Sequence, residues 1–325
     1  MIRLLLTRAA LAILFMWIAS SAMLGLVWLS PGDATSDMMG SVSERARMAE
    51  RTRLGLDRPF SQQYAGWLTH AVRLDLGSSL RYHRPVLSLV AERAANTALL
   101  AVAAFVLAVA IGLPLGVLTG SERYPLAGAL VRSSSLLMLS VPPLLLSLLL
   151  LWVAARTGWL PTGGMTTASS DEWSWWTRAG DLVAHLTLPV MALAVPLAAA
   201  LERLQSAAVM TQKSAPFVML ALARGASADR VLWRDVWRAA LTPVLGVLGL
   251  AAGRLLSGSL AVELVTAWPG LGRLMFDALG WRDAPLAAGC GAAAALALVT
   301  WSTVAEIVAR RVDPRMHDST QGGGA

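Results

Sequence analysis

A run of 21 residues without a charged side chain, Ala9 to Leu29, limits what this chain can fold into more than any other feature. As an α-helix the run would measure about 32 Å, and the hydrocarbon core of a bilayer is about 30 Å thick. Similar apolar blocks recur along the chain, and only 14% of the residues are charged, against about 25% in a typical soluble domain. Because a backbone in lipid must satisfy its own hydrogen bonds, we predict an all-α membrane protein.

Six apolar blocks are long enough to be membrane-spanning helices. We predict spans at residues 9–29, 94–119, 130–155, 183–203, 241–262 and 285–309. The first block is longer than the apolar core of a signal peptide, so we interpret it as an uncleaved helix. Pro142 and Pro143 should kink the third span, and Pro189 and Pro196 the fourth.

The spans divide the chain into three parts. These are 1–93, with the first span and an extracytoplasmic segment; 94–317, a core transmembrane domain with the cytoplasmic segment 204–240; and 318–325, a disordered tail. Within the outer segment we expect one short helix near 41–54 and another that starts at Pro59, because proline suits a first helical turn. Residues 77–85 should form a loop.

Arginine and lysine counts predict the orientation of the spans. With the N-terminus inside, the inner segments carry 13 basic residues and the short outer loops carry four: Arg156, Arg178, Arg273 and Arg282. Nine more lie in the 30–93 segment, but long segments contribute little to the rule. Both termini are therefore predicted to face the cytoplasm. The net charge of +7 then reflects span ends, and no nucleic-acid partner is expected.

The stretch ALARGASADRVLWRDVWRAALTPV, residues 221–244, lies between two apolar runs and is rich in arginine. Gly225 can end one short helix in the left-handed conformation, and Ser227 can cap a second helix with Asp229 in its first turn. Three arginines recur on one face of that second helix: Arg230, Arg234 and Arg238. A helix–glycine–helix elbow suits docking to another protein. A basic helix lying on anionic lipid would show the same periodicity, so both interpretations stay open.

Motifs for catalysis or metal binding are missing from the sequence. The one lysine, Lys213, lacks the preceding glycine of the phosphate-binding GxxxxGK[ST] pattern, and no histidine begins an HExxH pattern. We therefore predict that the chain is not an enzyme, has no cofactor or metal site, and does not hydrolyse ATP itself.

Charged residues inside spans are costly in lipid and are candidates for function. Arg254 lies well inside the fifth predicted span. It can line a polar path, pair with Glu306 in the sixth span, or cap carbonyls freed near Gly253 and Gly258. Glu306 is the only carboxylate that we place within a span. Cys290, the single cysteine, lies among small residues that favour close helix packing.

Several short motifs occur in a fixed order along nearly the whole chain. They are LLLTRAALAILF, WLSPGD, LGLDRPFSQQYAGWL, LDLGSSLRYHRPV, IGLPLGVL, SVPP, GWLPTGG, ARGASADRVLWRDVWRAALTPV, VELVTAWPGLGRLMFDAL and VDPR. In this order they resemble the permease subunits of the dipeptide/oligopeptide/nickel branch of ABC importers. AWPGLG and the spacing from Gly225 to Pro243 are the most specific. The resemblance implies a type I ABC importer permease fold in the cell inner membrane.

The resemblance also implies which residues couple the spans to ATP hydrolysis. In such permeases an Ala-x-Ala-[Lys/Arg]-Gly segment sits in a cleft of a separate ATPase subunit. The matching residues and their neighbours here are Ala221, Ala223, Arg224, Gly225, Ser227, Arg230 and Arg234. Closure of the ATPases on ATP would push this elbow and swing the spans from inward-open to outward-open.

The outer loop 262–285 is implied to dip toward the translocation path and the docked binding protein. Its candidate residues are Glu263, Trp268, Pro269, Gly270 and Gly272. A loop that only packs against the outer 30–93 segment is the alternative. The sequence departs from the family pattern at Met219 and Leu222, where similar proteins carry a charge.

The resemblance implies a permease for peptides or similar small solutes. Its partners would be a second homologous permease, two ABC ATPase subunits, an extracytoplasmic solute-binding protein and membrane lipid. An importer for nickel or a nickel chelate is the alternative within the family. A secondary transporter or channel that works without ATPases would predict acidic residues at mid-membrane, and a non-transporting assembly subunit is a third possibility.

Overall fold

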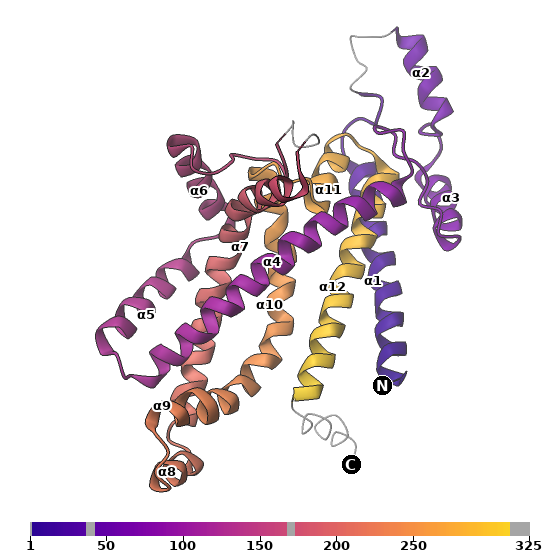
Figure 1. The fold of residues 1–325 in the computed structure, drawn as a ribbon. Coiled ribbons are helices and arrows are strands. Elements are labelled where there is room, and N and C mark those ends of the chain that lie inside the picture. Colours follow the sequence, from indigo (N-terminus) through magenta and orange to yellow (C-terminus); the bar gives the residue numbers. More distant parts are fainter. Residues whose placement is uncertain (1, 37–42, 168–172, 313–325) are drawn as a thin grey trace. The chain divides into compact units, whose positions relative to one another are not determined.

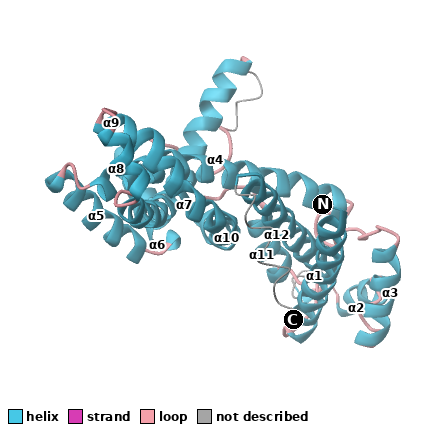
Figure 2. Cartoon of the chain, turned by 90° about the horizontal axis from the view of Figure 1, so that it is seen from below, coloured by secondary structure: helices cyan, strands magenta, loops and turns pink. Residues whose placement is uncertain are grey.

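The computed structural model describes residues 2–36, 43–167 and 173–312, and Figure 1 shows their arrangement as a ribbon. Within these ranges every regular element is a helix (Figure 2), which confirms the predicted all-α class. The predicted disordered tail, residues 318–325, lies outside the described residues. Side chains of a few helical residues, Arg254 among them, also lie outside the description.

The helices divide into two compact units, residues 1–98 with 269–299 and residues 99–268 with 300–325. The elements of the first unit are α1 (Ile2–Leu29), α2 (Glu44–Arg53), α3 (Phe60–Val72), the start of α4 (Val86–Ser121), α11 (Leu271–Gly280) and the start of α12 (Ala284–Val312). The second unit holds the rest of α4 and α12 with α5 (Pro125–Ser140), α6 (Pro143–Thr157), α7 (Trp175–Gln212), α8 (Pro216–Ala223), α9 (Ala228–Arg230), the π-helical segment η3 (Val231–Val236) and α10 (Trp237–Val265).

The first unit is held together where α12 packs on α1. The hydroxyl of Ser20 donates a 2.9 Å hydrogen bond to the carbonyl of Ala288, and a Cβ on Gly291 would lie 3.1 Å from the carbonyl oxygen of Ala19. Asp283, which is fully buried, accepts hydrogen bonds from Ser79 Oγ at 2.5 Å and from the Leu286 amide at 3.2 Å. This carboxylate therefore ties the 77–85 loop, predicted as such, to the first turn of α12.

Both short helices predicted within the 30–93 segment occur near their predicted positions. Ser43 caps α2 by accepting from the Ala46 amide, as its residue type favours. The second helix begins one residue later than predicted, because Pro59 has an extended ψ of 146° and is the residue before the helix. Aromatic side chains of α3 continue onto α1: the rings of Phe60 and Trp28 are 5.1 Å apart.

Apolar length agrees with membrane insertion but does not establish six spans. Four described helices are long and apolar enough to cross a membrane: Leu5–Leu29, Val86–Ser121, Trp175–Gln212 and Ala284–Val308. The bent pair of α5 and α6 would make a fifth. The predicted span 241–262 falls in α10, where several side chains lie outside the description and the described apolar stretch is Leu255–Val265. Six spans and cytoplasmic termini therefore stay predictions.

The third predicted span, 130–155, is not one straight helix. It is broken between Ser140 and Pro143, where α5 and α6 meet at 103°. Pro143 lacks an N–H, and a residue that precedes proline is disfavoured in the helical region, so Pro142 adopts an extended ψ of 144°. The predicted kink is thus confirmed as a full break. By contrast, α7 is helical through both Pro189 and Pro196.

Candidate functional site

The predicted elbow is present, and its bend is made at Gly225. Helix α8 ends at Ala223, and Gly225 follows with a φ of +83°. The Ala226 amide donates to the Ala221 carbonyl at 3.1 Å, and the Gly225 amide donates to the Leu222 carbonyl at 2.9 Å. These two bonds form the Schellman arrangement that closes a helix on a left-handed residue. A φ in this region favours glycine, so the sequence prediction for this position is confirmed.

The second arm of the elbow begins after Ser227, at the predicted cap position. Ser227 has extended dihedral angles, but its side chain makes no capping hydrogen bond, so that part of the prediction is wrong. Asp229 lies in the first turn, as predicted, and its carboxylate forms an ion pair with Arg123 at the turn between α4 and α5. From Val231 to Val236 the helix is π-helical, a form that is rare and occurs often at functional sites. We call residues 216–230 the elbow.

A second ion pair joins the same turn to the region before the elbow. Lys213 pairs with Glu122, which has a φ of +58°. The hydrogen bond from Lys213, followed by the charge of Lys213, holds the pKa of the Glu122 carboxyl below its usual range. The α4–α5 turn is thus linked to the elbow region at two points, Glu122 and Arg123.

One face of the elbow is anchored in an apolar cluster that also includes residues from α4, α7 and α10. Its buried members are Val117, Val209, Val218, Val231, Val236 and Ala240. Ala221 and Ala226 pack against this cluster from the two sides of the bend. The elbow is therefore joined to the ends of long helices by packed side chains, which suits the transmission of a displacement.

The opposite face of the elbow is exposed and apolar. Helix α8 has the sequence PFVMLALA, and Val218 is the one residue of it that is buried. The exposed fractions of its large side chains are 71% for Met219, 53% for Leu220, 45% for Leu222 and 39% for Phe217. The predicted coupling residues Ala223, Arg224, Gly225, Ser227, Arg230 and Arg234 are also exposed. A contiguous apolar surface rimmed by charges is typical of a site that another protein or a membrane covers.

The predicted outer loop passes from the second unit to the first between Trp268 and Pro269. In the second unit, Glu263 and Trp268 are fully buried. The Gly164 amide donates a 3.0 Å hydrogen bond to the Thr266 carbonyl, and Ala267 has a φ of +53°. This half is therefore a turn fixed against the 158–164 loop, with its aromatic side chain in the apolar core.

In the first unit, α4 fixes the other half of the loop. The side-chain amide of Asn96 donates a hydrogen bond to the Pro269 carbonyl at 2.9 Å. The backbone amide of Leu271 donates to Thr97 Oγ1 at 2.7 Å. Gly270 precedes α11 with extended dihedral angles. Gly272 lies in its first turn. Hydrogen bonds with α4 thus fix this half of the loop. Its contact with cargo or a binding protein stays a prediction.

Helices α4 and α7 meet along a seam that the sequence analysis missed. It consists of Gly112, Gly116 and Gly120 of α4, spaced by four residues, against α7. A Cβ at each of the three would lie 2.6 Å from a backbone oxygen of α7. Only glycine permits this approach, and the four-residue spacing is the small-xxx-small pattern of membrane helix pairs. We call this contact the α4–α7 seam.

A buried carboxylate beside the seam corrects the prediction that Glu306 is the only acidic residue within a span. Glu202 lies inside α7, within the predicted span 183–203, and is 1% exposed. Its Oε1 accepts a 2.5 Å hydrogen bond from the Thr119 hydroxyl, whereas Oε2 is buried without a partner among the described residues. Both amide atoms of Gln205 are likewise buried and unpartnered in the described part of the chain. Hydropathy averaged over a span hides such single polar residues.

Arg254, the predicted path residue, is described by its backbone alone. Arg254 lies within α10, but its side chain falls outside the described residues, so its role in a path stays a prediction. Within the described ranges, no group of three or more His, Cys, Asp or Glu side chains is placed to hold a metal ion.

The helical fold and the apolar spans together define a membrane protein that also carries an exposed apolar surface at the elbow. Comparison with known families identifies the family to which this membrane protein belongs. The family model described as binding-protein-dependent transport system inner membrane component matches residues 112–318, and its N-terminal counterpart matches residues 1–101.

Relatives of known name cover most of the chain. An oligopeptide transport system permease protein, AppB of Bacillus subtilis, is 32% identical over 290 residues, which are 88% of this chain and 90% of the relative. A putative peptide permease protein of Brucella ovis is 31% identical over 296 residues, or 90% and 91% of the two chains. A glutathione transport system permease protein, GsiC of Escherichia coli K12, is 32% identical over 274 residues, or 83% and 84%.

The chain therefore belongs to the family of binding-protein-dependent transport system inner membrane components. It is a multi-pass inner-membrane permease subunit of an ABC importer and not an enzyme, and ATP is hydrolysed by separate ATPase subunits. Glu202 is buried at the end of the predicted span 183–203 and not at its middle, so it does not meet the expectation for a transporter that works without ATPases, and the family assignment decides for the ATP-driven importer. The resemblance drawn from the sequence motifs is confirmed.

Proposed function

We propose that this chain is one of two permease subunits of an importer for peptides or similar small solutes. It pairs with a second, homologous permease, two ATPase subunits and an extracytoplasmic solute-binding protein. The names of the relatives support this proposal, since they are permeases for oligopeptides, peptides and glutathione. In the proposed orientation the chain crosses the membrane six times, both termini are cytoplasmic, and the 30–93 segment is outside.

We infer that the elbow docks on an ATPase subunit, and the apolar exposed face of α8 is the observation that carries this. Four large apolar side chains on an eight-residue helix are more than 35% exposed each, on a segment outside the spans. Leaving such a surface in water is unfavourable by roughly 25 cal/mol for each Å² of apolar area. The proposed docking residues are Ala221, Ala223, Arg224, Gly225, Ser227, Arg230 and Arg234.

The packing of the elbow gives a route for the motion. A push on α8 would act through Val218 and Ala221 on the apolar cluster shared with Val117 of α4 and Val209 of α7. Those two helices cannot slide apart easily, because their backbones are in contact along the α4–α7 seam. They would therefore move together as one lever. No catalytic side chain is needed for this task.

The outer loop would act mainly as a support for the path. In the second unit, the full burial of Glu263 and Trp268 supports a fixed turn. In the first unit, Asn96 and Thr97 of α4 hold the backbone at Pro269 and Leu271. We propose that Pro269, Gly270 and Gly272 face the translocation path and the docked binding protein. Arg254, placed on α10, is proposed to line the path itself. Replacing Arg254 by alanine should change uptake more than it changes the amount of assembled protein.

A matched pair of leucine substitutions tests the docking proposal. Leu220 is 53% exposed on α8, and Leu74 is 83% exposed in the turn after α3. Leu220 is chosen because similar proteins carry a charge at Met219 and Leu222. Leu220→Glu should abolish co-purification of the ATPases and ATP-driven uptake, because it adds a charge to the apolar docking face. Leu74→Glu makes the same chemical change elsewhere and should leave both readouts intact. Retention of ATPases by the Leu220→Glu complex at wild-type level would refute the docking face.

A further inference from the structure

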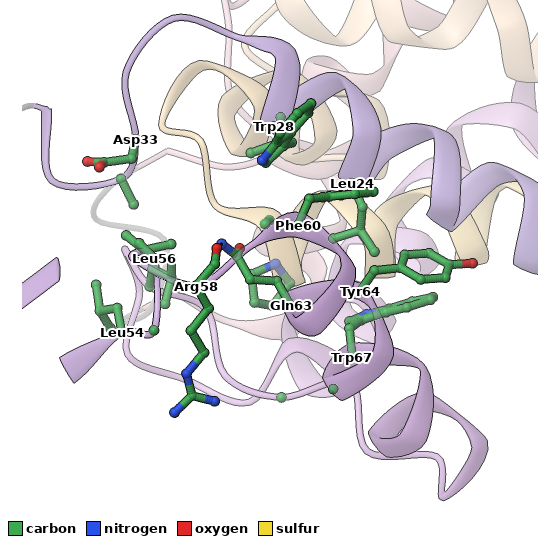
Figure 3. Close-up of a pocket in the computed structure, with 18 of the residues that line it drawn as sticks. Leu24, Trp28, Asp33, Leu54, Leu56, Arg58, Phe60, Gln63, Tyr64 and Trp67 are labelled. Carbon is green, nitrogen blue, oxygen red and sulfur yellow. The ribbon is translucent and has the colours of Figure 1, made fainter. Parts of the chain in front are cut away.

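A cavity of about 460 Å³ lies in the first unit, and the coupling function does not use it. Its walls are the outer end of α1, the turn before α3, α3 itself, the 75–80 loop and the start of α12. Figure 3 shows Leu54 and Leu56 on one side and Leu24, Tyr64 and Trp67 on the other. A volume of this size falls within the range of small-molecule sites in proteins. We call it the outer pocket.

One wall of the outer pocket is a continuous series of aromatic rings. Ring centroids are 5.1 Å apart for Trp28 and Phe60, 5.9 Å for Phe60 and Tyr64, and 6.1 Å for Tyr64 and Trp67. All four residues line the cavity. Such a wall offers apolar surface to a chain-like ligand and places amphipathic rings where water meets apolar material, as in the aromatic belts of membrane proteins.

The charged groups of the pocket leave a surplus of positive charge. Both carboxylates are already engaged: Asp33 with Arg51 at 2.9 Å, and Asp75 with His70 at 3.1 Å. Two further arginines, Arg58 and Arg282, line the cavity, and neither has an acidic partner among the described residues. Arg282 Nε donates to the Pro31 carbonyl, which leaves its terminal amino groups for another acceptor. The rim therefore favours an anion.

The position of α3 along α1 sets the depth of the pocket. The Tyr64 hydroxyl is hydrogen-bonded to Ser21 Oγ at 2.8 Å and accepts from Trp17 Nε1 at 2.9 Å. Ser21 lies eight residues before Leu29, the end of α1, which corresponds to about 12 Å along the axis. Helix α3 therefore runs back along the outer half of a predicted span. With the proposed orientation, the pocket lies at the outer water–lipid boundary.

We propose that the outer pocket binds one anionic phospholipid, with the phosphate at Arg58 and Arg282 and the upper part of an acyl chain against the aromatic wall. This inference depends on the proposed orientation of the chain, which places the pocket at the outer leaflet. An apolar wall, an unneutralised guanidinium rim and a position at the boundary are the three properties that recognise an amphiphile with an anionic head. A bound lipid would fasten α3 and the 75–80 loop to the outer end of α1.

Native mass spectrometry and photo-crosslinking test the pocket on the full chain in lipid nanodiscs. The probes are phosphatidylglycerol and phosphatidylcholine that carry a diazirine in one acyl chain. We expect about fivefold preferential retention of phosphatidylglycerol: both lipids have a phosphate, but the choline ammonium cancels its charge in phosphatidylcholine, and the attraction of one arginine to a net anionic lipid contributes roughly 1 kcal/mol. Crosslinks should map to the α3 peptide that contains Tyr64 and Trp67. Equal retention of the two lipids, or crosslinks confined to other helices, would overturn the proposal.

Three variants make the test specific. Arg58→Gln should remove the preference, whereas Arg45→Gln on α2, outside the pocket, changes the same charge and should keep it. Gly66 lines the cavity with nothing within 4 Å of an added Cβ. Gly66→Leu should fill the pocket and reduce crosslinking by both lipids. Unchanged crosslinking in Gly66→Leu would contradict the site.

Competition separates the lipid from other anions. Excess inorganic phosphate and excess tripeptide should leave the crosslink unchanged. Displacement by phosphate would identify a free-anion site, and displacement by peptide would identify a peptide carboxylate, so either result would overturn the lipid assignment. A cysteine placed at Met219 should be labelled from the cytoplasmic side if the proposed orientation is correct. This labelling tests the orientation independently of lipid binding, so an error in the orientation and an error in the lipid site give different results.

Discussion

The α4–α7 seam and the elbow both depend on glycine, but for opposite reasons. At Gly116 the backbone dihedrals are helical and space is missing: an added Cβ would lie 2.5 Å from Cβ of Gln205 and 2.6 Å from the Glu202 carbonyl oxygen. At Gly225 space is open, with nothing within 4 Å, but φ is +83°. The seam is a rigid contact inside the chain. The elbow is a shaped surface that another chain can cover.

The largest expected effect concerns the interior that surrounds the seam. Trp268→Ala would remove a fully buried side chain from the core cluster of the second unit. Loss of a buried large aromatic side chain costs about 3–5 kcal/mol, so thermal unfolding in detergent should occur at a markedly lower temperature. Trp159→Ala is the control, since Trp159 is 82% exposed. Similar unfolding temperatures for the two variants would show that the interior tolerates a void.

The next effect should appear at the seam itself. Gly116→Ala adds one methyl group where it overlaps α7, and overpacking of this kind costs about 1–3 kcal/mol. Gly246→Ala makes the same change in α10 with nothing within 4 Å and should be neutral or stabilising. Protease resistance of the purified variants measures the difference. If Gly116→Ala is as resistant as Gly246→Ala, the close approach of α4 and α7 is wrong.

A smaller effect on stability, but a specific effect on function, is expected at the elbow. Gly225→Val forces a β-branched residue into the left-handed region, at a cost of about 1–2 kcal/mol. ATP hydrolysis should continue while uptake falls about tenfold, and membrane insertion should be unchanged. Gly225→Asn is the control, because asparagine tolerates this conformation. Normal uptake by Gly225→Val would remove the bend from the coupling mechanism.

The smallest effect should come from the exposed ion pair between the α4–α5 turn and the elbow. Arg123→Glu or Asp229→Arg alone should reduce uptake per ATP hydrolysed by less than about fivefold, because exposed pairs contribute about 1 kcal/mol or less. The double exchange restores opposite charges and should restore most of the coupling. A double variant that is no better than the two single variants would show that this ion pair does not position the elbow.

Sequence reasoning succeeded where one residue type allows only one local structure. Gly225 at a helix end and the Pro142–Pro143 pair predicted the bend and the break, because each acts through its own backbone. Sequence reasoning failed where the local structure depends on a contact with a residue from another part of the chain. Ser227 occupies a cap position but makes no cap bond, and the spacing of Gly112, Gly116 and Gly120 has meaning only once α7 is beside it.

Helix lengths were also underestimated, for a related reason. Hydropathy predicted a span at 183–203, whereas α7 runs from Trp175 to Gln212. Beyond the apolar block the helix continues with packed and polar residues, which a hydropathy window does not register. The same averaging concealed Glu202, a single carboxylate among apolar neighbours.

The burial of Cys290 has a practical consequence. This thiol, the only one in the chain, is fully buried in the core of the first unit. Water-soluble maleimides should therefore leave the wild-type protein unmodified, and a background free of cysteine is unnecessary. Reporter groups introduced at any surface position can be attached selectively, so distances across the working transporter can be followed by spectroscopy without altering the native sequence elsewhere.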